Sequence, residues 1–238
     1  MARRCFVTAT DTGAGKTIVA ATIAAGLLAQ GLAVHVRKPV VTGVAPGAPG
    51  APSVPQENAD LAGLPDHELL AAVSDERAQD VAWATYEPAV SPHLAAELAG
   101  APLDVAAIVA ALNEAAGEAE AFVVEGIGGL LVPLTQDWDV RRLAAALAWP
   151  IVIVARPGLG TINHTLLSIE AARSGGLDVR AVVLTPWPAA AGTLERSNRA
   201  TIERLAGVEV ATLAEIRPLT RAGFAAAART LPYERWLG

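Results

Sequence analysis

A glycine-rich segment near the N-terminus has the composition of a phosphate-binding loop. The sequence TATDTGAGKT spans Thr8–Thr17, after a first apolar run and before an Ala-rich stretch. Gly13 and Gly15 carry no Cβ, so the backbone can approach phosphate oxygens, and the amides of the segment would point at the anion from a helix N-terminus. We therefore expect Lys16 to reach the β- and γ-phosphates of a nucleotide and Thr17 to place its hydroxyl on Mg²⁺.

This segment departs from the strict pattern G-x-x-x-x-G-K-[ST] at one position, where Thr10 stands. A glycine-rich strand–helix turn without a ligand is the alternative interpretation, but Lys and Thr together at the helix start favour phosphate binding. The chain has no Asn-Lys-x-Asp sequence, which GTPases use to recognise guanine. Asp11 stands where partitioning and metallochaperone ATPases of the deviant P-loop group carry another lysine, so neither of these classes is indicated.

A second lysine follows the next strand-like run. Lys38 lies in RKPVVTG, and Pro39 ends the run that precedes it. If this strand lies beside the one before the glycine-rich loop, Lys38 faces the same phosphates. A solvated charge at a strand end is the alternative, and the neighbouring loop makes it the weaker one.

Two acidic residues are candidates for holding the magnesium ion that phosphoryl transfer requires. Glu125 ends the apolar run AFVVEG and precedes the glycine-rich Gly126–Gly129, and a carboxylate there needs a cation to offset its desolvation. Asp60 begins DLAGL. Together with Thr17 they form the predicted metal set. The alternatives are a helix-capping or dipole role for Glu125 and an N-cap role for Asp60.

Apolar runs of strand length alternate with Ala- and Leu-rich stretches of helix length. The predicted strands are Cys5–Ala9, Ala33–Lys38, Ala121–Glu125, Ile151–Ala155, Arg180–Leu184 and Glu209–Leu213, and the predicted helices are Lys16–Gln30, Val105–Ala116, Val140–Ala148, Ile162–Arg173 and Leu194–Leu205. The strands are continuously apolar, as in parallel sheets covered on both faces. We predict an α/β fold with a doubly wound, mainly parallel sheet flanked by helices, P-loop NTPase-like, as a single domain over residues 1–238. The Pro- and Gly-rich Val44–Pro55 is expected to be a mobile loop.

Composition and charge argue against nucleic-acid binding, a membrane span, a disulfide and a zinc site. The net charge is −6, the pI is about 5.2 and no run of five basic residues occurs, so no nucleic-acid partner is expected. The longest apolar stretch, Leu143–Ala155, is too short to span a bilayer, and no secretory leader pattern is visible, so the cytoplasm is the default location. The single cysteine, Cys5, excludes an internal disulfide and a Cys-based zinc site, and we expect it in the core.

Taken together, the motifs resemble those of the dethiobiotin synthetase family. The matching segments are FVTATDTGAGKT from Phe6, KPVVTG, Asp60, the SPH of Ser91–His93, the VEGIGG of Val124–Gly129 and the GTINH of Gly160–His164, and they occur in the family's order over Phe6 to about Asn198. The combination is far more specific than any one of them.

The resemblance implies ATP-dependent ring closure on 7,8-diaminononanoate with CO₂, through a carbamate and a carbamic–phosphoric anhydride. It implies Mg²⁺ and ATP, with nucleotide or metal contacts from Gly13, Ala14, Gly15, Lys16, Thr17, Ile18, Asp60, Glu125, Gly126, Gly128 and Thr185. Lys38 and Lys16 would be catalytic, and Thr12 and Thr42 would bind the amines or the carbamate. The resemblance also implies a homodimer in which the partner's loop, here Gly160, Thr161, Ile162 and Asn163, would bind the substrate's carboxylate tail.

Three positions depart from the family's pattern. Ala9 and Ile127 stand where it has glycine and a small residue, and Thr185 stands near its adenine-reading asparagine. A threonine lacks the paired donor and acceptor of an amide, so we expect nucleotides other than ATP to be accepted. Trp187 either stacks on a base or packs in the fold. We expect His93 to help shape the diamine pocket.

Two other functions remain open from the residues. A switch ATPase acting through a protein partner would leave Lys38, the glycines after Glu125 and the GTINH segment without a role. A small-molecule kinase would give a phosphorylated product and no uptake of CO₂.

Overall fold

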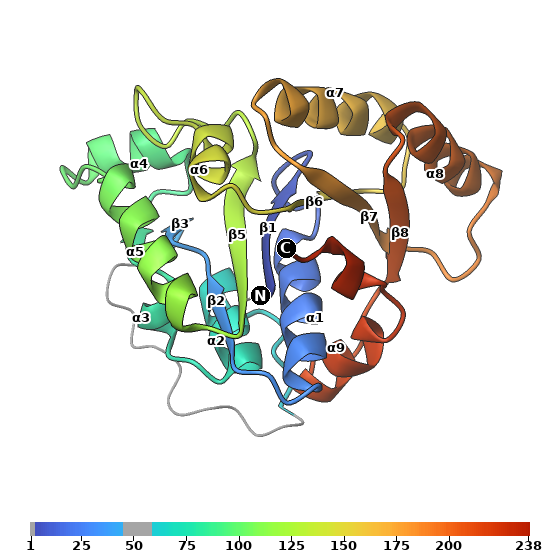
Figure 1. Cartoon of the computed structure of the whole chain (residues 1–238), viewed down its shortest axis with the longest axis horizontal. Helices are drawn as coiled ribbons and strands as arrows, with labels where there is room; N and C mark the ends of the chain where they lie inside the picture. The colour runs from blue at the N-terminus through green and yellow to red at the C-terminus, as the bar shows by residue number, and fades with distance from the viewer. Residues whose placement is uncertain (1–2, 45–58) are drawn as a thin grey trace.

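The chain is built around one six-stranded sheet whose strands all run parallel, with helices on both faces (Figure 1). The computed structural model describes residues 3–44 and 59–238. The strand order is β2-β5-β1-β6-β7-β8, with β1 Arg3–Ala9, β2 Val34–Arg37, β5 Ala121–Gly129, β6 Ile151–Ala155, β7 Val179–Trp187 and β8 Glu209–Ala214. The predicted fold class is confirmed. Apart from Val44, the segment predicted as a mobile loop lies outside the described residues.

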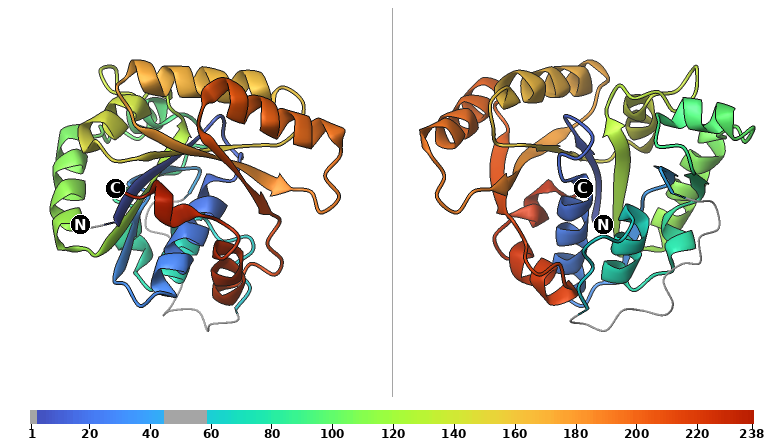
Figure 2. Two further views of the ribbon diagram at one scale, coloured as in Figure 1. Left: turned by 45° about the vertical axis from the view of Figure 1, so that its right-hand side comes forward. Right: turned by 180° about the vertical axis from the view of Figure 1, so that it is seen from behind.

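Side chains alternate between the two faces of the sheet, and each face has its own core. Cys5 and Val7 point to one face and Phe6 to the other. The first face packs under α1 (Lys16–Leu28), α2 (Asp66–Ser74) and α9 (Arg221–Ala228), and the second under α5 (Val105–Glu118), α6 (Val140–Leu147), α7 (Thr161–Ser174) and α8 (Thr193–Ala206) (Figure 2). Cys5 is fully buried, as expected, and burial raises the pKa of its thiol to about 12.

Helix α1 is buried nearly all round because it lies between the sheet and two other helices. Its buried positions run continuously from Val19 to Leu27, and five of those nine are Ala or Gly, so it shows no single apolar stripe. Small side chains let α9 and the sheet approach closely. The helix therefore fixes its N-terminus, and with it Lys16, relative to the sheet.

Several short elements were not predicted from the sequence. They are β3 (Val40–Thr42), α3 (Ala78–Val81), β4 (Ala84–Tyr86), α4 (Pro92–Leu98) and the 3₁₀ helix η1 (Tyr233–Trp236), together with α2 and α9. The strands β3 and β4 form a separate parallel pair. Elements of three or four residues give too few periodic positions to be recognised in a sequence.

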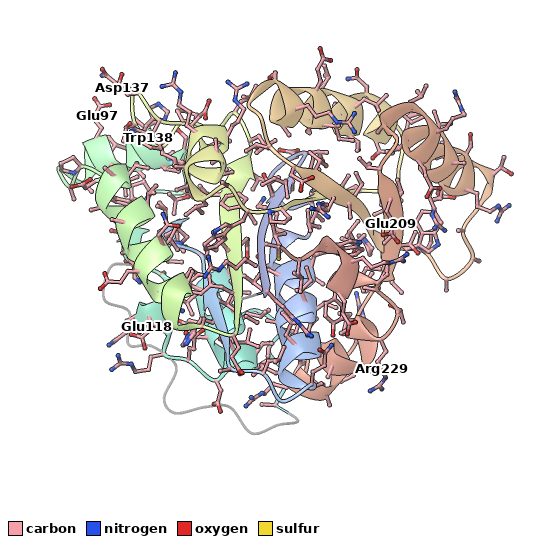
Figure 3. The ribbon with its side chains drawn as sticks, in the orientation of Figure 1. Glu97, Glu118, Asp137, Trp138, Glu209 and Arg229 are labelled. Atoms are coloured by element: carbon pink, nitrogen blue, oxygen red, sulfur yellow. The ribbon has the colours of Figure 1, made fainter. Side chains whose placement is uncertain are left out.

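The C-terminal segment is tied to the sheet by polar contacts at the start of β8. Glu209 accepts hydrogen bonds from Trp236 Nε1 at 3.0 Å and from Arg235 Nη2 at 2.8 Å, and it is labelled in Figure 3. Gly238 exchanges two backbone hydrogen bonds with Arg4. Among the described residues no helix combines the length and apolarity needed to cross a membrane.

The packing of η1 on α1 generates a stability prediction. A Cβ on Gly26 would lie 2.6 Å from ring atoms of Tyr233, so Gly26→Ala should lower the free energy of unfolding by about 1–3 kcal/mol through overpacking. In α5, a Cβ on Gly117 would meet nothing within 4 Å, so Gly117→Ala should leave stability unchanged or raise it. Urea unfolding of both variants measures the difference. Equal effects of the two substitutions would contradict the packing.

Candidate active site

A cavity of about 620 Å³ opens at the carboxyl ends of β1, β2 and β5. In a doubly wound sheet this is the edge where ligands bind. The loop after β1, the residue after β2 and the end of β5 all contribute to it. The residues lining it are Thr12, Gly13, Gly15, Lys16, Thr17, Ile18, Lys38, Val41, Thr42, Asp66, Leu69, Ala89, Val90, Ser91, Pro92, Glu125, Ile127, Gly128 and Val132.

The strand register places Lys38 beside Glu125. In the β2–β5 pair Arg37 lies opposite Val124, so the next residue on each strand comes level at the edge of the sheet. Lys38 Nζ lies 2.6 Å from Glu125 Oε1, and both side chains are buried, 5% and 0% exposed. The hydroxyl of Thr17 donates to the same oxygen at 3.0 Å. Three of the residues predicted from sequence thus meet at one carboxylate.

Asp66 completes this cluster, and the sequence did not predict it. It is the first residue of α2, follows Pro65, and its carboxylate forms an ion pair with Lys38 Nζ. A carboxylate at this place is stabilised by the helix dipole. Proline followed by two acidic residues before an apolar run, PDHELL, is the signal of a helix start that could have revealed it.

Opposite charges in the cluster stabilise one another's ionised forms against the effect of burial. Burial by itself would lower the pKa of Lys38, but the carboxylates of Glu125 and Asp66 outweigh it and raise that pKa. Asp66 loses solvation as well, yet the ammonium of Lys38 holds its pKa below the usual range. Burial raises the pKa of Glu125, and Lys38 acts in the opposite direction. Burial also lowers the pKa of Lys16, so the two lysines are shifted in opposite directions.

The glycine-rich loop has the backbone conformation that an anion cradle needs. Gly13 and Gly15 have φ of 70° and 100°, which favours glycine. A Cβ on Gly15 would also lie 2.9 Å from Thr185 Cγ2. Lys16 Nζ donates to the carbonyl of Asp11 at 3.2 Å, so it lies across the loop.

The oxygen atoms of the cluster fit a magnesium ion. Glu125 Oε2 is buried and has no hydrogen-bond partner among the described residues, and it lies in the same cluster as the Thr17 hydroxyl and Asp66. Mg²⁺ takes oxygen ligands, commonly one or two carboxylates together with substrate phosphates and water. Within residues 3–44 and 59–238 no group of three or more His, Cys, Asp or Glu side chains forms a metal site. Two carboxylates and a hydroxyl are what this cluster offers.

Asp60, the other predicted metal ligand, does not join this cluster. It is exposed, and its Oδ1 accepts from the amide of Ala62 at 3.1 Å, so it does not cap α2. It lines a second cavity of about 640 Å³. Asp60 was a candidate because it begins DLAGL and matches the family's motif, but the turn at Ala62 and the start of α2 place Asp66, and not Asp60, beside Lys38.

The second cavity lies on the other side of the glycine-rich loop and shares Gly13, Gly15 and Ile18 with the first. Its other lining residues are Ala14, Asp60, Ala62, Thr185, Pro186, Ala214, Glu215, Ile216, Arg217, Pro218 and Leu219. Thr185 is therefore next to the loop, as its predicted role requires. Trp187 is half-buried against the core under α8 and is absent from the lining of both cavities.

The remaining predicted residues lie in different parts of the structure. Thr12, Thr42 and Gly128 line the first cavity, whereas Gly126 packs against Phe6 and Val140. The tail-binding residues, Gly160, Thr161, Ile162 and Asn163, open α7 and line neither cavity of this chain. Ser91 and Pro92 line the first cavity, while His93 is exposed on α4.

Lysine is confined to this site. The sequence contains two lysines, Lys16 and Lys38, and its other basic residues, apart from four histidines, are arginines. Both lysines are buried and line the first cavity. A compact ammonium suits a position where it must contact phosphate or carboxylate oxygens as a point charge.

A divalent cation that uses these oxygens must compete with Lys38 for them. Lys38→Met should therefore bind Mn²⁺ or Mg²⁺ without nucleotide about tenfold more tightly than the unchanged chain, because it leaves two carboxylates uncompensated. Electron paramagnetic resonance of free Mn²⁺ measures this affinity. The double variant Lys38→Met, Asp66→Asn serves as the control and should lose the gain. Weaker metal binding by Lys38→Met would contradict the competition.

The AAA domain family model matches residues 3–223 of this chain. The ATP-dependent dethiobiotin synthetase of Anaeromyxobacter sp. (strain Fw109-5) is 38% identical over 218 residues, which cover 91% of this chain and 92% of that protein. The protein of the same name from Rhodococcus jostii (strain RHA1) is 39% identical over 97% of this chain and 95% of its own length.

Solved structures agree on the fold alone. Apo McdA from Cyanthece gives a TM-score of 0.54 at 12% identity, over 98% of this chain and 94% of that one.

The curated relatives show the family. Because relatives more than 30% identical match this chain over nearly its full length, the chain belongs to the family of ATP-dependent dethiobiotin synthetases, enzymes of the ligase class.

Proposed function

We propose that this enzyme closes a ureido ring on 7,8-diaminononanoate with CO₂ and ATP, giving dethiobiotin. Its family gives it an ATP-dependent role in biotin biosynthesis. The observation that carries the finer proposal is the position of Lys38, held between Glu125 and Asp66 and lining the same cavity as Lys16. A reaction whose charge develops on a phosphoryl group and a carbamate needs cations at that point.

The triphosphate lies on the glycine-rich loop, with its phosphates on the amides at the start of α1. Two features support this placement: the positive φ angles of Gly13 and Gly15, and the buried Lys16 at the N-terminus of the helix. The base then enters the second cavity beside Thr185. Its neighbours there include Pro186 and Pro218, which have no amide donor.

Thr17, Asp66 and Glu125 hold Mg²⁺ in this proposal, with Asp66 in the place first given to Asp60. Mg²⁺, when bound, neutralises charge on the β- and γ-phosphates and orients them for in-line transfer. Lys38 then releases the two carboxylates and turns its ammonium to the carbamate and the transferring phosphoryl group. The cluster supports this exchange because Lys38 and the metal need the same oxygens.

The diamine occupies the first cavity. Thr12 and Thr42 hydrogen-bond its amines or the carbamate, and the apolar lining by Val41, Ile127 and Val132 suits a polymethylene chain. One amine takes up CO₂ as a carbamate, and a carbamate oxygen attacks the γ-phosphorus as ADP leaves. The second amine attacks the carbon of the resulting anhydride, and phosphate departs. The protein acts mainly by positioning and charge neutralisation.

The substrate's carboxylate tail reaches a second copy of the chain in this proposal. The amides at the start of α7, residues 160–163, suit an anion because Gly160 has φ of 88° and the helix begins at Thr161. They line neither cavity of their own chain, and Leu159 beside them is 92% exposed. A homodimer that brings this loop over the partner's first cavity accounts for both facts.

The reaction is tested by incorporation of labelled bicarbonate into an acid-stable product in the presence of diamine and ATP. We expect incorporation by the unchanged chain and a loss of at least about 100-fold in Lys38→Ala, because the transition-state charge loses a fixed cation. Arg180→Ala, which removes an exposed cation at the other end of a strand, is the control and should stay active. ATP turnover without diamine, or a phosphorylated diamine without label, would favour a switch ATPase or a kinase instead.

The base cavity generates a separate prediction on selectivity. With Thr185 and two prolines in place of an amide side chain, kcat/KM for ATP, GTP and CTP should lie within about tenfold of one another. Thr185→Asn should widen the preference for ATP. Steady-state kinetics with the three nucleotides measures it, and a preference for ATP above 100-fold in the unchanged chain would refute it.

A further inference from the structure

Arg156 is the first residue after β6 and reaches the glycine-rich loop from a different part of the chain. β6 pairs with β1 so that Val154 lies opposite Ala9, and the amide of Thr10 donates to the carbonyl of Val154 at 3.0 Å. The residue that follows β6 must therefore lie beside the loop that follows β1. Neither the predicted site nor the proposed reaction uses Arg156.

The guanidinium of Arg156 contacts the loop through its carbonyl oxygens. Nη2 donates to the carbonyl of Gly13 at 3.0 Å and lies 3.5 Å from that of Thr12, and Nε lies 3.3 Å from the Gly13 carbonyl. A Cβ on Gly13 would lie 3.0 Å from Nη2. Arg156 is absent from the lining of both cavities, so it approaches the loop from outside the nucleotide site.

These carbonyls belong to the peptide groups whose amides face the phosphates. The carbonyl of Thr12 shares its peptide group with the amide of Gly13, and that of Gly13 shares it with the amide of Ala14. A cation on the oxygen polarises the N–H of the same group, because hydrogen bonds in a chain strengthen one another. It also restrains Gly13 at a φ of 70°, which free glycine does not favour over other values.

Arg156 is itself anchored, and its charge is not taken up by an acid. Asn198 of α8, a buried side chain, donates to the carbonyls of Pro157 and Gly158 at 2.9 and 3.1 Å, which fixes the segment after Arg156. Two other exposed arginines, Arg77 and Arg180, each pair with a neighbouring aspartate. Among the described residues Arg156 forms no such ion pair.

We propose that Arg156 is a positioning residue of the nucleotide site: it holds the carbonyls of Thr12 and Gly13 from outside, so that the amides on the inner side bind phosphate. The inference depends on phosphate binding by the loop and not on the identity of the amine substrate. Nucleotide binding can be measured without the diamine, so failure of the proposed carboxylation would leave the test intact.

The test compares Arg156→Ala and Arg156→Lys with Arg180→Ala as a matched exposed-arginine control. Dissociation constants for ADP and for a non-hydrolysable ATP analogue are measured by calorimetry, with and without Mg²⁺. Arg156→Ala should weaken both about tenfold, the order expected from losing one charge-assisted hydrogen bond near the surface. The effect should persist without Mg²⁺, and turnover at saturating nucleotide should change by less than about twofold.

Arg156→Lys should recover only part of the affinity, because one ammonium cannot span two carbonyls as a guanidinium does. Melting temperatures without nucleotide should match those of Arg180→Ala. Three results would overturn the proposal. Affinity equal to the control would remove the contact from nucleotide binding. Full rescue by lysine would mean that charge alone acts, and a fall in turnover at unchanged affinity would place Arg156 in the reaction itself.

Discussion

The ion pair between Lys38 and Glu125 is the interaction on which the site depends. A carboxylate buried to 0% exposure at the end of an apolar strand is unfavourable without a cation, and the ammonium that contacts it, that of Lys38, is buried as well. Asp66 adds a second negative charge from another element, and Thr17 adds a hydroxyl. The charges of this group offset one another only while Lys38, Glu125 and Asp66 are all in place. It therefore joins the glycine-rich loop, the second strand, the fifth strand and α2 in one arrangement.

The topology of the sheet makes that arrangement possible. β1 lies in the middle of the sheet, with β2 and β5 on one side and β6, β7 and β8 on the other. The loops and residues that follow β1, β2 and β5 meet at one edge and form the first cavity. The end of β7 and the residues that follow β8 line the second cavity, and Arg156 after β6 holds the glycine-rich loop between the two. One edge of one sheet thus accommodates the reacting groups, the base and the support of the loop.

Much of this could be predicted from the sequence. The six strands of the sheet follow from continuous apolar runs, and Lys16, Thr17, Lys38 and Glu125 follow from their positions at strand and helix ends. Asp66 did not follow, because the segment before it is rich in Pro and Gly and gives no register, and the family's motif pointed to Asp60 instead. Arg156 did not follow either, because its partners are backbone carbonyls. Every residue has a backbone carbonyl, so the residue types do not indicate this contact.

The measurement that tests this account most directly is the titration of the two lysine side chains in protein labelled with ¹⁵N-lysine, without divalent ions. Because the chain has only two lysines, each ammonium signal can be assigned with one variant. Lys16, whose pKa is lowered by burial, should lose its proton at a lower pH than Lys38, whose pKa the two carboxylates raise. If Lys38 deprotonates together with Lys16 or before it, the ammonium is not held by Glu125 and Asp66, and the account of the site fails.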